Sequence, residues 1–272
     1  MYANLTEYAA PEVLNVPLET IYLKSKVLLA QLGKPEDLLA QLMDAPPTKR
    51  ITAASQNLMD LGAVDANGEV GALGRIAVFM PVTIQLTKLV LTAWALGCPC
   101  DGVVMAAALS TQDVFKLATP QAANRPEDFP KMLSENYLIR AWHDDGQFSE
   151  PIMYRNLYLD FLTTNLNRHQ WLDRNCVSAS RIQQFTSLIS EIAEKFTWAV
   201  PDARNDPALK QLRDAKRGGM KDLGQMFDMS EAAYPRIKMA LCGAFAPSFV
   251  LGEINFTNKN ENKIKKSGFD HT

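Results

Sequence analysis

The sequence is poor in the residues that build disulfide frameworks and metal sites. Its 272 residues include 4 cysteines and 3 histidines. Only Cys98 and Cys100 lie close together, and their spacing fits no paired zinc-ligand pattern. So few cysteines in a chain of this length favour free thiols in a reducing compartment over disulfide bridges. We therefore expect no metal site and no disulfide framework.

The sequence also lacks a dominant charge and a long apolar run. Its formal net charge is −2, so any attraction for nucleic acid must come from a local patch. The most apolar stretches, residues 89–97 and 102–109, are too short to span a bilayer. Residues 1–10 lack the basic segment and apolar run of a signal peptide. We expect a soluble, intracellular protein without membrane contact.

Motifs for nucleotide chemistry are missing as well. No G-x-x-x-x-G-K-[ST] loop occurs, and the segment from Gly62 to Gly68 lacks the lysine and hydroxyl that bind phosphate and magnesium. No Asp-Glu-Ala-His run occurs either. We expect the chain to hold no cofactor and to have no catalytic residues of its own.

The first part of the chain shows the three- and four-residue spacing of amphipathic helices. We expect one helix over residues 18–32, ended by Gly33, a short one after Pro35, and a third over residues 52–61. The side chains expected to face inward are Leu18, Ile21, Tyr22, Leu28, Leu29 and Leu32, then Leu38, Leu39 and Leu42, then Ala54, Leu58 and Leu61.

A hairpin is expected directly after these helices. Asn67-Gly68 stands between two short alternating runs, and both positions of such a turn favour positive φ. Three helices and a hairpin are the outline of a winged helix, which we assign to residues 1–82. We expect Leu58, Leu61 and Ile76 to share one core beneath the turn.

Residues 83–198 are expected to form a helical bundle. Apolar residues recur there in five stripes, and such stripes form core in most proteins. We expect Trp142 to end the third of these helices. The stripes are Leu86, Leu89, Val90, Ala93 and Leu96; Val103, Val104, Ala107 and Ala108; Phe129, Met132, Leu133, Asn136, Tyr137 and Arg140; Leu157, Phe161 and Leu162; and Ile182, Phe185, Leu188, Ile189, Ile192 and Phe196.

The pattern changes after the bundle. Residues 199–233 contain prolines, paired glycines and the most basic stretch of the chain, so we interpret them as a mobile linker or insertion. Residues 234–272 are expected to hold a short helix over 236–245, a strand over 248–256 and a polar, lysine-rich tail.

The order of short motifs over residues 8–120 resembles the segment that follows the second RecA-like domain of DEAH-box RNA helicases. The motifs are Pro-Glu-Val-Leu at 11–14, Asp-Ala-Pro-Pro at 44–47, Leu-Gly-Ala-Val-Asp at 61–65, Leu-Gly-Arg at 73–75 and Ala-Ala-Ala-Leu-Ser at 106–110. Residues 242–247, Cys-Gly-Ala-Phe-Ala-Pro, are similar to the tudor-domain-containing helicases of the spindle-E type. The chain departs from the pattern at Asn15 and Gly71, where arginine and threonine are usual, and over residues 204–230, which have no counterpart.

The resemblance implies a mainly α fold: a winged helix, a helical ratchet-like bundle over residues 83–198, and the beginning of an OB-fold over residues 234–272. It implies an accessory C-terminal region that packs on RecA-like motor domains and closes a channel around single-stranded RNA. ATP and magnesium would then belong to the parent protein. The spindle-E type would place that protein in piRNA silencing, in cytoplasmic, perinuclear granules, with a nuclear location as the alternative. A non-enzymatic protein-interaction scaffold and a DNA-binding winged-helix regulator remain alternative functions.

Candidate RNA contacts follow from the resemblance and from local charge. The resemblance places Ser110 and Lys116 at the bundle edge facing the RNA channel, although both also suit an ordinary helix end. Arg75 either contacts RNA or the motor domains, or forms a buried ion pair between wing and bundle, which we favour. The basic stretch forms either a solvated run or a salt-sensitive RNA patch of Lys210, Arg213, Lys216, Arg217 and Lys221.

Two further groups have weaker functional interpretations. Lys49 and Arg50 open the third helix, which would enter the major groove in a DNA-reading winged helix, but the apolar neighbours argue against this. His143 is followed by Asp144 and Asp145, and we expect these three residues to form a solvated loop rather than a catalytic base.

The missing phosphate loop generates a prediction. The purified chain is expected neither to bind ATP nor to hydrolyse it, with or without RNA, because no segment is built to hold the phosphates. Isothermal calorimetry and a phosphate-release assay would measure this. An RNA-stimulated ATPase activity that co-purifies with the chain through every column would contradict it.

Overall fold

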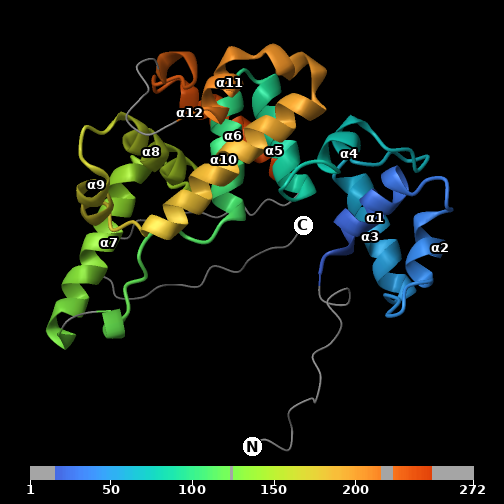
Figure 1. The fold of residues 1–272 in the computed structure, drawn as a ribbon, viewed down its shortest axis with the longest axis horizontal. Helices are drawn as coiled ribbons and strands as arrows, with labels where there is room; N and C mark the ends of the chain where they lie inside the picture. Colours follow the sequence, from blue (N-terminus) through green and yellow to red (C-terminus); the bar gives the residue numbers. More distant parts are fainter. Residues whose placement is uncertain (1–15, 123–124, 216–222, 247–272) are drawn as a thin grey trace, which may run out of the picture.

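The structure is a computed structural model that describes residues 16–122, 125–215 and 223–246. Over these residues the protein is mainly α-helical, with a smaller N-terminal unit beside a larger bundle (Figure 1). Two separate cores underlie these parts, one from Leu18 to Ile84 and one from Ile76 to Ala244. No helix in the described ranges is both long and apolar enough to cross a membrane.

The N-terminal unit contains α1 (Leu18–Leu28), α2 (Pro35–Ala40), α3 (Thr48–Asp60) and α4 (Ala72–Ala77). The sequence predicted inward-facing leucines up to residue 32, and this prediction is wrong at the C-terminal end of the first helix. The helix stops at Leu28, so Leu28 and Leu32 are 58% and 70% exposed rather than packed. Leu42, which follows α2, is also exposed.

An antiparallel turn follows α3 where a hairpin was predicted, and it contains one isolated bridge and no strand. Val64 and Val70 form an antiparallel bridge, and Asp65 N donates to Glu69 O at 2.9 Å. The expected turn chemistry is wrong in one respect, because only Gly68 has a positive φ, of 81°. The turn is instead held by the Asp65 carboxylate, which accepts hydrogen bonds from the backbone N–H groups of Asn67 and Glu69.

Helix α4 packs closely under this turn. A Cβ atom on Gly74 would lie 2.4 Å from Ala63 O, so only glycine permits the approach. Leu58 and Leu61 contribute to the N-terminal core, but Ile76 belongs to the core of the bundle. The expectation that all three share one core is therefore wrong, because α4 has one face toward each core.

Helix α6 (Pro99–Ser110) forms the centre of the bundle, and its residues 99–108 are all buried. It packs against α5 (Ile84–Ala95), α8 (Glu150–Thr163) and α10 (Ala179–Ala199). A Cβ on Gly102 would lie 2.4 Å from the Cβ of Ala93, which marks the close approach of α5 and α6. The predicted stripes of these helices form the core, and α12 (Ala233–Phe245) covers α5 from outside.

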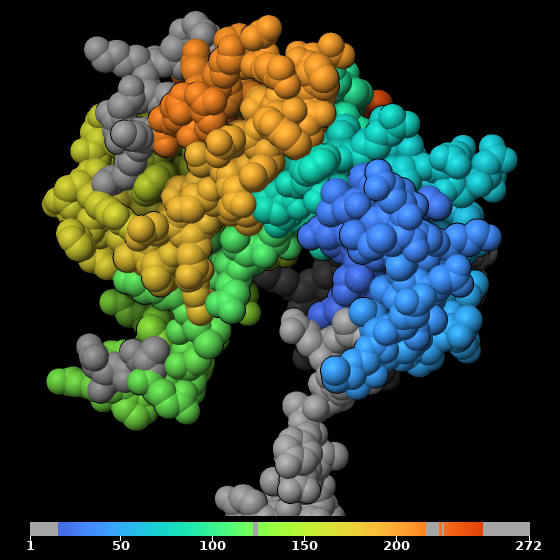
Figure 2. Space-filling view, turned by 45° about the vertical axis from the view of Figure 1, so that its right-hand side comes forward, coloured from blue at the N-terminus to red at the C-terminus, as the bar shows by residue number. Residues whose placement is uncertain are grey.

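Helix α7 (Phe129–Asp144) projects from the bundle, and Figure 2 shows a hollow between it (green) and the N-terminal unit (blue). Its expected stripe is covered only in part: Asn136 is buried, Tyr137 is exposed, and the other four members are half-buried. His143, near the C-terminal end of the helix, is buried, with Nε2 2.9 Å from Asn175 Oδ1. The expectation of a solvated loop at His143 is therefore wrong. The neighbouring α9 spans Arg168–Arg174.

The segment expected to be a linker is packed in its described part. After the short 3₁₀ helix Pro201–Asn205, α11 (Pro207–Arg213) lies on α10, with Leu209 and Leu212 buried. The Asp206 carboxylate caps α11 by accepting from two backbone N–H groups. Further 3₁₀ turns occur at Pro120–Ala122, Pro126–Asp128 and Leu223–Gln225, and the expected strand over 248–256 lies outside the described residues.

A buried ion pair joins the helices of the bundle. Arg155 on α8 donates from Nε to Asp101 Oδ1 on α6 at 2.7 Å, and the two side chains are 4% and 1% exposed. Its Nη2 donates to the backbone oxygen of Asp228 at 2.8 Å, and Asp228 in turn pairs with Arg236 on α12. One guanidinium group thereby links three segments of the bundle.

This pair generates a prediction about stability. Arg155→Met leaves a buried carboxylate without its partner, so the free energy of unfolding should fall by about 3–5 kcal/mol. Asp101→Leu should cost a similar amount, whereas the double variant should recover much of the loss, because no unpaired charge remains. Urea denaturation followed by circular dichroism measures all three.

The matched control is Lys131→Met, which breaks the exposed pair of Lys131 and Glu135 at 3.9 Å. It should change stability by less than about 0.5 kcal/mol. The prediction would be contradicted if the double variant Asp101→Leu, Arg155→Met lost as much free energy of unfolding as the two single variants together.

Candidate nucleic-acid interface

The two predicted channel residues lie at the end of α6 and in the segment that follows it. Ser110 is exposed, and its hydroxyl donates to Ala106 O at 2.9 Å. Lys116 is also exposed, and its Nζ lies 3.0 Å from Asp173 Oδ1. We call Ser110, Asp113, Lys116, Arg140 and Asp173 the bundle edge.

The charges of the bundle edge are balanced. Lys116 pairs with Asp173, and Arg140 pairs with Asp113. Burial alone would raise the pKa of Asp113, but hydrogen bonds from Tyr154 and Arg140 together hold that pKa below its usual value. Asp113 is therefore a carboxylate at neutral pH. Arg181, which donates to the backbone oxygens of Asp113 and Phe115, adds one positive charge beside these two ion pairs.

The predicted basic stretch forms part of a second surface. Lys210 and Arg213 lie on α11, whereas Lys216, Arg217 and Lys221 lie outside the described residues. Lys210 and Arg213 open onto a hollow of about 510 Å³, which we call the basic hollow. It is lined by Phe79, Glu194, Lys195, Thr197, Trp198, Arg204, Asn205, Lys210 and Arg213.

Four cationic side chains and one carboxylate line the basic hollow. Arg213 pairs with Asp214 at 2.9 Å, and Lys210 Nζ donates to Asn205 Oδ1 at 3.4 Å. Within the part of the chain that the structure describes, Lys195 and Arg204 form no ion pair. The basic hollow therefore carries a larger excess of positive charge than the bundle edge.

Sequence reasoning missed Lys195, Arg204 and the two aromatic residues of this hollow. Trp198 carried a usable signal, because it stands two residues after the buried Phe196 and so falls off the apolar stripe of its helix. Phe79 carried no such signal, since only the packing of α4 against α10 brings it to this surface.

The two surfaces lie at opposite ends of α10. Near its start, Arg181 Nη1 donates to Asp113 O and Phe115 O, at 2.8 and 3.0 Å. Near its end, Trp198 lines the basic hollow. At about 1.5 Å of rise per residue, these positions are roughly 25 Å apart along the helix. The bundle edge and the basic hollow are separate surfaces.

Arg75 is not the buried ion pair that we favoured. It is exposed, and its Nε donates to Val70 O at 3.2 Å, because α4 directs this side chain back over the turn. Arg50, at the start of α3, donates from Nη2 to Val16 O at 2.9 Å. It is therefore tied to the chain preceding α1 and not presented alone to a nucleic-acid groove.

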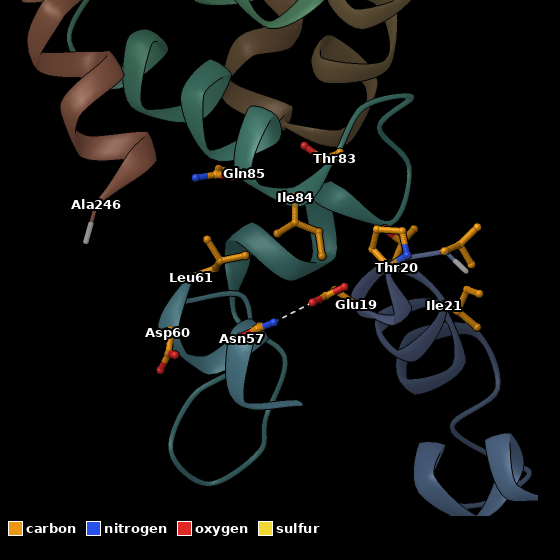
Figure 3. A pocket seen from close by; sticks show the side chains of 12 residues that line it. Glu19, Thr20, Ile21, Asn57, Asp60, Leu61, Thr83, Ile84, Gln85 and Ala246 are labelled. Atoms are coloured by element: carbon orange, nitrogen blue, oxygen red, sulfur yellow. Dashed lines mark hydrogen bonds between the residues drawn. The ribbon is translucent and has the colours of Figure 1, made fainter. Parts of the chain in front are cut away.

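A larger hollow of about 760 Å³ separates α1 and α3 from the start of α5 (Figure 3). Its charged lining residues are Glu19 and Asp60, and Glu19 accepts a hydrogen bond from Asn57 Nδ2 at 2.7 Å. An acidic rim around apolar side chains such as Leu61 and Ile84 repels phosphate. Among the described residues, no group of three or more His, Cys, Asp or Glu side chains is arranged to hold a metal ion.

The chain is similar to curated RNA helicases, although no protein-family model matches it. It is 26% identical over 204 residues to "Probable ATP-dependent RNA helicase spindle-E" of Drosophila willistoni, covering 70% of this chain and 13% of the relative. It is 24% identical over 214 residues to "ATP-dependent RNA helicase TDRD9" of Danio rerio, covering 71% and 14%. It is 37% identical over 112 residues to "ATP-dependent DNA/RNA helicase DHX36" of Bos taurus, covering 41% and 11%.

These relatives confirm the relationship to ATP-dependent RNA helicases that the motifs predict. The chain spans between 11% and 14% of the length of these three proteins. It therefore matches one region of each relative.

The basic stretch generates a prediction. Neutralising Lys210, Arg213, Lys216, Arg217 and Lys221 together should weaken binding of single-stranded RNA and flatten its salt dependence. Each phosphate contact contributes about −0.7 to the slope of log affinity against log salt, so the slope should fall by at most about 3.5. Fluorescence anisotropy at several salt concentrations measures both quantities.

A control variant neutralises five lysines elsewhere: Lys24, Lys26, Lys34, Lys49 and Lys238. It changes the net charge equally and should keep most of the affinity, because binding depends on local cations. Equal losses in both variants would show that only the overall charge matters.

Proposed function

We propose that this chain is the accessory C-terminal region of a DEAH-box ATP-dependent RNA helicase and closes its channel for single-stranded RNA. The observation that carries the proposal is the similarity to RNA helicases over 70% and 71% of the chain in two relatives. RecA-like motor domains of the parent protein would bind ATP and Mg²⁺ and supply the other wall of the channel.

Each part of the chain has a role in this proposal. Residues 1–82, with α1 to α4 and the turn, act as a winged helix. Residues 83–198 act as the ratchet-like bundle, residues 199–233 connect the parts, and residues 234–272 begin an OB-fold. Packing of such units against the motor domains would couple ATP hydrolysis to movement of the strand. Arg75, exposed beside the turn, is available for contact with the motor domains.

The bundle edge has the electrostatics that a sliding contact needs. Its two ion pairs are neutral and Arg181 adds a single positive charge, so a phosphate gains hydrogen bonds there with only modest attraction. A strand can then move past Ser110 and Lys116 in steps, because each contact is weak. The resemblance to the spindle-E type supports a role of the parent protein in piRNA silencing, in cytoplasmic, perinuclear granules, with the nucleus as the alternative.

One observation favours the alternative of a protein-interaction scaffold. Helix α7 exposes Leu138 and Trp142, which are 69% and 81% accessible. Apolar side chains grouped on one helix are typical of binding surfaces for other proteins. In contrast, the tie between Arg50 and Val16 disfavours a DNA-reading winged helix.

The bundle edge generates a prediction that tests the proposal. Asp173→Asn releases Lys116 from its ion pair and should strengthen binding of single-stranded RNA at low salt. Lys116→Ala should weaken binding and reduce the salt slope by about 0.7, the contribution of one phosphate contact. Fluorescence anisotropy with a mixed-sequence RNA and with a DNA duplex measures both effects.

Asp60→Asn is the matched control, because it removes the same charge from an exposed aspartate on α3, in the N-terminal unit. It should change RNA affinity less than Asp173→Asn. Unchanged RNA affinity in both Asp173→Asn and Lys116→Ala would overturn the proposed function. Tighter binding of one DNA duplex sequence than of RNA would also overturn it.

A further inference from the structure

We propose that the basic hollow is a second site for single-stranded RNA, in which unpaired bases stack on an aromatic pair while the surrounding cations hold the phosphates. The proposal rests on the proposed function in its ligand class, RNA. It goes beyond that function because the basic hollow and the bundle edge lie at opposite ends of α10.

The aromatic pair consists of Phe79 and Trp198. Their ring centroids are 4.8 Å apart and their planes meet at 75°, an edge-to-face contact. Phe79 follows the end of α4 and Trp198 lies in the last turn of α10, so the pair joins two elements that are distant in the sequence. The contact holds the two rings beside each other.

Both rings nevertheless remain open to solvent. Phe79 is 41% exposed and Trp198 is 58% exposed, and both line the basic hollow. Folding therefore leaves aromatic surface uncovered inside a concavity. Such surface is suited to stacking with a planar ligand, and stacking on aromatic side chains accepts any base.

The cations lie around this pair. Lys195 precedes Trp198 by three residues on α10, so both side chains lie on the same side of the helix. Arg204 follows in the 3₁₀ turn, and Lys210 reaches the hollow from α11. Neither Lys195 nor Arg204 forms an ion pair with a described residue, so both are available to phosphates.

This combination favours a single strand over other polyanions. In a duplex, the faces of the bases are already stacked on each other, so an aromatic pair gains nothing from them. An acidic peptide would satisfy the cations but would leave the aromatic faces without partners. An unpaired strand offers both phosphates and free base faces.

Trp198→Leu tests the stacking contact directly. Leucine keeps apolar contact with Phe79 but offers no aromatic face, so RNA affinity should fall about 5- to 150-fold, the usual range for losing one base–aromatic stack. Trp142→Leu is the matched control, because Trp142 on α7 is 81% exposed and lies outside the basic hollow. It should leave the affinity unchanged.

Two probes separate stacking from charge. An abasic oligomer of the same length carries the phosphates without bases. It should bind wild type weakly, and its affinity should not change in Trp198→Leu.

RNA should quench tryptophan fluorescence in Trp142→Phe, which keeps Trp198, and should quench it much less in Trp198→Phe. Polyglutamate should bind more weakly than RNA at equal charge. Circular dichroism melting of each variant verifies that it is folded.

The outcomes distinguish this site from the bundle edge. Unchanged RNA affinity in folded Trp198→Leu would overturn the second site, and a response to Lys116→Ala would still support the proposed function. Conversely, RNA affinity could fall in Trp198→Leu and stay unchanged in Lys116→Ala. This result would support the second site and overturn the bundle-edge contact. Polyglutamate binding as tightly as RNA would overturn the assignment of the ligand.

Discussion

The buried ion pair of Asp101 and Arg155 constrains the rest of the bundle. An isolated charge at this depth costs several kcal/mol, so the pair is tolerated only while its remaining hydrogen-bonding groups are also satisfied. Asn156 and the backbone oxygen of Asp228 accept the other guanidinium hydrogen bonds, at 3.0 and 2.8 Å. These requirements hold α8 and the segment before α12 in place against α6. Helix α10 packs on the same buried α6, so the surfaces at its two ends are held at a constant separation.

Local pairing, rather than total charge, distinguishes the two candidate surfaces. The chain as a whole carries a formal charge of −2. At the bundle edge, Asp173 neutralises Lys116 and Asp113 neutralises Arg140. At the basic hollow, Lys195 and Arg204 have no ion-pair partner among the described residues, and an exposed tryptophan lies beside them. Paired and unpaired cations are thereby separated along a single helix.

Errors in the sequence-based expectations share a physical cause. Periodicity shows which side chains fall on one face, but not whether another element covers that face. Leu32 falls on an apolar face and is exposed, because α1 ends before it. His143 has polar neighbours in sequence and is buried, because α7 packs there against Asn175. Leu209 lies in a stretch rich in charge and proline, and it is buried because α11 folds back on α10.

The sequence by itself determined the helical class, the turn at Gly68 and the kinship with RNA helicases, because these depend on local spacing and on the order of short motifs. It also determined that no phosphate loop is present. The tertiary structure alone decided which charges are neutralised and which aromatic rings meet. Lys116 and Asp173 are 57 residues apart, and Phe79 and Trp198 come from different helical elements. Such contacts form only when helices that are distant in the sequence pack together. Which helices pack together depends on the fit of whole helix faces, and no single sequence pattern shows that fit.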